Sequence, residues 1–160
     1  MNRLFERNGM AFELVDGEIR RIAPAILDEA LAHTRFHSGD AHLDELLEKV
    51  RTKFLNRSLE VRRESLEKLW DAWERLKTLE PGKDNKASTL ALLDKVASEP
   101  VMREHLGREA MELSDMGNKL MIRHTETDIE AIAQSSQVDY LFHRMFAMIS
   151  LLLRATGRAG

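Results

Sequence analysis

An eleven-residue run, 118–128, crowds chemically capable side chains at the end of a long amphipathic pattern. It holds the amide of Asn118, the guanidinium of Arg123, the imidazole of His124 and the carboxylate of Glu126. On a helix that continues through this run, His124 falls on the apolar stripe. An imidazole moves a proton near neutral pH, and a guanidinium holds a phosphate bidentately. The spacing of the run favours a hydrogen-bonded helix end, with acid–base chemistry at a catalytic site as the functional alternative.

A second polar pair, His143 and Arg144, interrupts the most apolar stretch of the chain and is flanked by Tyr140. A polar pair on an otherwise apolar helix is costly unless it has partners. One hypothesis is that these three residues face the first cluster and gather two His and two Arg in one site. The alternative is that Arg144 neutralises a buried acid such as Glu74 or Glu109.

Three other histidines, His33, His37 and His42, are spaced in a way that invites a metal site, since the first two are four residues apart. The chain has no cysteine to join them, and a predicted helix breaks between the last two. The sequence also lacks glycine-rich phosphate loops and a nucleophile-elbow motif. We therefore predict neither a metal nor a cofactor.

Apolar residues that recur at three- and four-residue intervals predict a series of helices. In the third of these, Trp70 and Trp73 share the apolar face, and the other face carries opposite charges four residues apart, such as Asp71 and Arg75. The last helix is apolar nearly all round, which predicts a place at the centre of the fold or at a subunit interface. The expected ranges are about 24–35, 41–56, 59–79, 86–97 and 98–124, then a short helix from 127 and a last helix over 136–156.

The N-terminal segment has a different period. Phe12 and Leu14 alternate with polar residues, and Asp16-Gly17 is a preferred pair for a two-residue hairpin turn. We expect an all-α fold, a compact bundle of about five to seven helices, with this small β-hairpin added. The 160 residues then form a single domain in which segment 1–23 packs on the bundle.

Composition limits the classes of protein that fit. The formal net charge is −3, so any contact with nucleic acid would be local. The most apolar run, 138–153, is short for a membrane span and contains an arginine. The first residues show no apolar leader segment. We expect a cytoplasmic protein without a membrane partner.

Four segments, 63–78, 117–118, 122–126 and 139–144, together resemble the HEPN-type helical domains of prokaryotic abortive-infection (AbiJ-like) proteins. The resemblance implies an all-α, commonly dimeric domain of phage-defence or toxin–antitoxin systems. Active members are metal-independent endoribonucleases whose motif opens with Arg followed by Asn, Asp or His, and closes with a His. Arg123-His124 matches the opening, whereas Asp128, Ile129 and Glu130 stand where the closing His would fall.

The resemblance implies that the RNA 2′-hydroxyl attacks the neighbouring phosphodiester, helped by a His and by Arg123. Asn118 and Glu126 would orient those groups, and the partners would be RNA, a second copy of the chain, and an antitoxin or other defence-system protein. Two alternatives stay open: a degenerate RNA-binding relative, and a non-catalytic helical dimerisation or interaction module.

Overall fold

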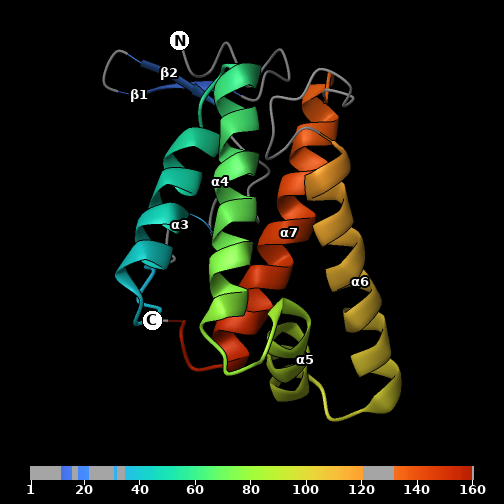
Figure 1. The fold of residues 1–160 in the computed structure, drawn as a ribbon. Coiled ribbons are helices and arrows are strands. Elements are labelled where there is room, and N and C mark those ends of the chain that lie inside the picture. Colours follow the sequence, from blue (N-terminus) through green and yellow to red (C-terminus); the bar gives the residue numbers. More distant parts are fainter. Residues whose placement is uncertain (1–11, 16–17, 22–30, 32–34, 121–131, 160) are drawn as a thin grey trace.

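The computed structural model describes residues 12–15, 18–21, 31, 35–120 and 132–159 of the chain. Within these ranges five helices pack around a single apolar core, which confirms the prediction of a helical bundle (Figure 1). The helices are α3 (Ala41–Phe54), α4 (Leu59–Thr78), α5 (Asn85–Val96), α6 (Pro100–Lys119) and α7 (Ser135–Ala155).

Two short strands precede the bundle and pair antiparallel, β1 (Phe12–Val15) with β2 (Glu18–Arg21). The turn predicted at Asp16-Gly17 lies outside the described residues, and so does most of the expected helix that starts at Pro24. The hairpin prediction for segment 1–23, including its packing on the bundle, therefore stays a prediction.

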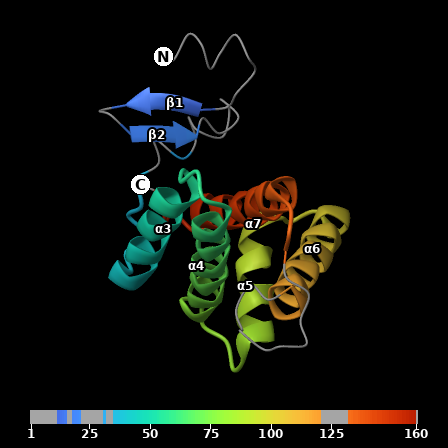
Figure 2. The same cartoon turned by 90° about the horizontal axis from the view of Figure 1, so that it is seen from above.

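The long helices run alongside one another (Figures 1 and 2). Helix α3 runs antiparallel to α4 and makes its most extensive contacts with it. Helix α7 packs against α4 and α5, and α6 lies at the outer side of the bundle against α5 and α4. The shorter α5 closes the end of the bundle where α4 stops and α6 begins. Helix α4 thus contacts each of the other four described helices.

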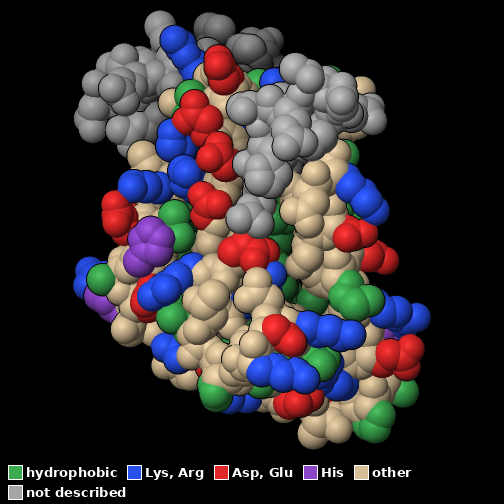
Figure 3. Space-filling model, in the orientation of Figure 1, with side chains coloured by type: hydrophobic (Ala, Val, Ile, Leu, Met, Phe, Trp, Pro, Cys, Tyr) green, Lys and Arg blue, Asp and Glu red, His purple; other side chains and the backbone are tan. Residues whose placement is uncertain are grey.

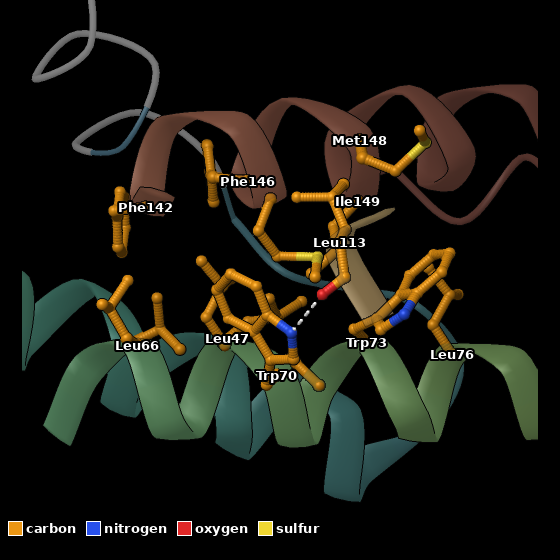
Figure 4. Packing of buried hydrophobic residues seen from close by; sticks show 14 of the residues in the cluster. Leu47, Leu66, Trp70, Trp73, Leu76, Leu113, Phe142, Phe146, Met148 and Ile149 are labelled. Atoms are coloured by element: carbon orange, nitrogen blue, oxygen red, sulfur yellow. Dashed lines mark hydrogen bonds between the residues drawn. The ribbon is translucent and has the colours of Figure 1, made fainter. Parts of the chain in front are cut away.

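The core forms where the apolar face of α4 meets α7. Trp70 and Trp73 are fully buried and point from α4 toward α7, as Figure 4 shows. Nine of the 21 residues of α7 are buried, so this helix is central, as its apolar sequence predicted. Phe142 of α7 stacks on Phe54 of α3, with ring centroids 3.6 Å apart.

The helix starts agree with the predicted ranges to within a residue or two, but the end of α6 differs. Helix α6 ends at Lys119, with Leu120 as its C-cap, and does not continue to His124 as predicted. Apolar periodicity locates the buried face but does not specify where the last backbone hydrogen bond forms. The start of α7 is capped by Gln134 and Gln137, whose side chains bond each other's backbone.

Charged residues of α4 pair with neighbouring helices as well as within α4 itself. Glu64 pairs with Lys53 of α3, and Arg75 binds Asp40, the N-cap of that helix. The pairing expected between Asp71 and Arg75 is replaced, since Asp71 contacts Lys68. Charged residues that the sequence suggested would pair within α4 therefore bind α3 and its N-cap, and they fix how α3 packs on α4.

Candidate functional site at the start of helix α7

A buried arginine of α4 fixes the start of α7. Arg62 is only 3% exposed, and its Nη1 donates to Ser135 Oγ over 2.7 Å while its Nη2 donates to the Ser135 carbonyl over 3.2 Å. The same guanidinium forms an ion pair with Asp139 one turn further along α7. Its carbon also lies 5.7 Å from the centre of the Phe54 ring. A charge buried this deeply is tolerated because carboxylate, hydroxyl and carbonyl oxygens surround it.

The end of α6 is fixed to the same helix. Trp70 Nε1 donates to the carbonyl of Leu113 over 2.8 Å (Figure 4). One turn later Gly117 lies against the indole so closely that a Cβ there would sit 2.1 Å from Trp70 Cδ1. Only glycine permits this approach, so the residue type sets the distance between α6 and α4.

These two contacts lie on either side of the run that the sequence singled out. Arg123, His124 and Glu126 lie outside the described residues. The chain that leads into them is attached to α4 through Trp70, and the chain that follows them is attached to α4 through Arg62.

Arg144 is engaged with acids of α6. Its Nε and Nη2 donate to the two carboxylate oxygens of Glu109, both over 2.8 Å, and Nη2 also lies 3.0 Å from Glu112. The hydrogen bond to Glu109 raises the pKa of Arg144 and lowers that of Glu109. This is the arrangement that the sequence offered as an alternative, with Glu109 as the acid, while Glu74 contacts Lys77. Arg144 therefore holds α6 on α7.

His143 and Tyr140, which the sequence grouped with Arg144, contact different neighbours. The imidazole of His143 is half-buried and meets the rings of Phe54 and Phe142 edge-on, at 5.5 and 5.7 Å between centroids. Tyr140 is 59% exposed, and its ring lies 5.6 Å from the guanidinium carbon of Arg144. Asn118 is exposed near the end of α6. The structure thus separates His143, which faces α3, from Arg144, which faces α6.

Of the three histidines considered for a metal, His37 and His42 are exposed, and His33 lies outside the described residues. In the described part of the chain no cluster of three His, Asp or Glu side chains is arranged to hold a metal ion. None of the helices described is long and apolar enough to cross a membrane.

Sequence reasoning missed Arg62, although it is the most deeply buried charged side chain at this site. It stands among other charged residues in the first turns of α4, and its partners Ser135 and Asp139 are more than 70 residues away. A weak signal was present, since Arg62 falls three and four residues from Leu59 and Leu66 on the apolar face. Compared with known proteins, the sequence matches no protein-family model and no curated protein, and the fold matches no solved structure.

Proposed function

We propose that this chain is a HEPN-like domain that acts on RNA through the segment bearing Arg123, His124 and Glu126. The observation that supports the proposal is the attachment of the chain to α4 on both sides of that segment, through Trp70 and through Arg62. Catalytic groups on a connecting segment work only when a rigid scaffold holds its ends. The described helices supply such a scaffold.

The reaction is a transesterification. The RNA 2′-hydroxyl attacks the adjacent phosphorus, the bond to the 5′-oxygen breaks, and the products are a 2′,3′-cyclic phosphate and a 5′-hydroxyl. His124 takes or gives a proton, and Arg123 stabilises the negative charge that develops on the phosphorane oxygens. Asn118 and Glu126 orient these two groups. No metal enters the scheme.

The described side chains support different roles for the polar residues of α7 and for Arg123 and His124. Arg144 is neutralised by Glu109 and Glu112, so binding the phosphate falls to Arg123. Tyr140 is exposed beside this ion pair and offers a ring on which an RNA base stacks. His143 contributes packing between aromatic rings. Arg144 and Tyr140 therefore shape the surroundings of the reaction, and the proposal assigns proton transfer to His124.

The charge distribution favours a small RNA footprint. On the face drawn in Figure 3, acidic and basic side chains are interspersed among the coloured residues, and acidic ones follow the upper part of α4. With a net charge of −3, the protein is expected to contact few phosphates, so its affinity for RNA should fall only gently as salt rises. A homodimer and a defence-system partner protein remain expectations of the same proposal.

The test is RNA cleavage by purified protein in excess EDTA. Cleavage should persist under chelation and disappear in the Arg123→Ala/His124→Ala variant. The matched control is His105→Ala/Arg108→Ala, because these two residues form an exposed Arg–His contact of 2.8 Å on α6. Equal cleavage by all three proteins would contradict the proposal, and so would loss of cleavage in the His105→Ala/Arg108→Ala control.

A second candidate function is a helical interaction module, favoured by the surface of α6. Val101 and Met111 are 70% and 64% exposed on this helix, which buries only Ala110, Leu113 and Gly117 among its described residues. Met111→Glu should then lower the oligomer mass seen by light scattering without changing helix content. A protein that stays monomeric with and without this substitution would exclude self-association through α6.

A further inference from the structure

A small hollow lined by arginines lies at the other end of the bundle from the start of α7. It is formed where the segment before α3 meets the last turns of α7 and the residues after them. Its volume is about 30 Å³. Its lining includes three arginines and two serines, Arg35, Arg154, Arg158, Ser38 and Ser150, and also the apolar residues Phe36, Leu47, Leu153 and Ala159. We call these three arginines and their hollow the C-terminal arginine pocket.

The end of α7 is built so that Arg158 reaches into this pocket. Gly157 has a φ of +68°, and its N–H bonds the carbonyl of Arg154, while the N–H of Arg158 bonds the carbonyl of Leu153 over 2.8 Å. This pair of bonds is a Schellman motif, which reverses the chain direction after a helix. The reversed chain carries Arg158 back to the segment before α3, where its Nη1 donates to the Ser38 carbonyl over 3.0 Å.

The pocket has more positive charge than its acids neutralise. In the part of the chain that the structure describes, Arg35 and Arg154 form no ion pair and no hydrogen bond through their side chains. Arg158 lies 3.6 Å from Glu80, but that carboxylate is shared with Lys95, whose Nζ is 2.5 Å away.

One donor in the pocket is buried and has no acceptor. Arg158 Nε has no hydrogen-bond partner among the described residues, although the atom is shielded from solvent. A buried N–H of a charged side chain is stabilised by an oxygen acceptor, so an oxyanion that reached Arg158 Nε would be bound favourably. Guanidinium groups bind oxyanions through parallel N–H···O bonds, and the Arg158 fork presents Nε beside an Nη.

We propose that the C-terminal arginine pocket binds a phosphate group, either as inorganic phosphate or as the terminal phosphomonoester of a small molecule. Three guanidiniums match a dianion better than the single charge of a carboxylate. The volume of about 30 Å³ admits about two water-sized atoms, so two oxygens of one phosphate enter, while its other oxygens and any nucleobase stay outside. None of its lining residues belongs to the segment proposed to act on RNA.

The experiment follows the arginine Nε–Hε signals by NMR and the heat of binding by calorimetry while inorganic phosphate is added at constant ionic strength. The expected result is saturable binding of one phosphate with a shift of the Arg158 Nε–Hε signal. Titrations with adenosine 5′-monophosphate and with acetate run in parallel. Tighter binding of the nucleotide identifies a monoester as the ligand, and equal or weaker binding identifies the free ion. Acetate binding as strong as phosphate overturns the proposal.

Variants decide whether the pocket is the place of binding. Arg154→Gln and Arg35→Gln should each weaken phosphate binding by about tenfold or more, since each removes a charge-assisted bond. The matched control is Arg57→Gln, an exposed arginine between α3 and α4 that removes the same charge. Arg123→Ala should leave phosphate binding intact even if it abolishes RNA cleavage, so the two proposals fail separately. No saturable binding, or an equal loss in the Arg57 control, overturns the proposal.

Discussion

Replacing Gly117 by alanine tests how closely α6 must approach α4. The added Cβ would lie 2.1 Å from Trp70 Cδ1 and 2.2 Å from Trp70 Nε1. Carbon atoms in contact are about 3.5–4.0 Å apart, so either the helix or the indole has to move by more than an ångström. Trp70 is fully buried and its N–H is bonded to Leu113, so the indole has no free space to move into.

The expected change in the free energy of unfolding is the sum of three contributions. Alanine is favoured over glycine in a helix by about 1 kcal/mol. Overpacking a core costs about 1–3 kcal/mol, and this contact belongs near the upper limit. Losing the bond from Trp70 to Leu113 leaves a buried N–H unsatisfied, which costs about 1–3 kcal/mol more. The clash outweighs the helix propensity, and Gly117→Ala should lower the free energy of unfolding by about 3–5 kcal/mol, equivalent to a fall in Tm of about 6–20 °C.

The assay is urea unfolding followed by circular dichroism at 222 nm, with Gly107→Ala as the matched control. Gly107 lies in the same helix, and its added Cβ would meet only the end of the Arg103 side chain, at 3.4 Å. The control should therefore be neutral or stabilised by up to about 1 kcal/mol. Equal free energies of unfolding for the two variants would refute the view that the Trp70 contact sets the position of α6.

Three further substitutions test other contacts. The hydrogen bond from Arg75 lowers the pKa of Asp40 from 3.8 to about 2, so its stabilising effect is complete above about pH 4 and is lost as the pH falls toward 2. The stability difference between wild type and Asp40→Asn, from urea midpoints, should shrink over that range, and a constant difference would contradict the assignment. Arg144→Gln should lose about 1–2 kcal/mol of unfolding free energy, while Glu112→Gln, at a side chain 64% exposed, should change it by no more than about 0.5 kcal/mol. Gly157→Ala has open space for its Cβ but a φ of +68°, so a calorimetric scan should show a loss of about 1 kcal/mol that comes from the backbone alone.

The sequence predicted the helices well because apolar periodicity reports burial directly. Both tryptophans assigned to the apolar face of α4 are buried, and α3 buries five apolar residues at three- and four-residue spacing: Leu43, Leu46, Leu47, Val50 and Phe54. What the pattern did not predict was the end of α6. Leu120 continues the apolar stripe, but the helix stops one residue earlier, because helix ends depend on local hydrogen bonds that residue spacing does not encode.

Side-chain partners were harder to predict than helices. The pairing of Arg144 with Glu109 was one of two alternatives, and only the packing of α6 against α7 selects it. The C-terminal arginine pocket had no signal in the sequence, because Arg35 and Arg158 come together only after the whole bundle has formed. Sites assembled from distant segments have no characteristic spacing, so a single sequence does not reveal them.

Helix α4 acts as a spacer between its two attachment points. Arg62 and Trp70 are eight residues apart, which corresponds to about 12 Å along the axis and about 80° around it. Inserting or deleting one residue between them would turn one attachment about 100° away from its partner. The length of the run between α6 and α7 is not constrained in this way. Evolutionary changes in chain length should therefore collect between 120 and 134 and be absent between 62 and 70.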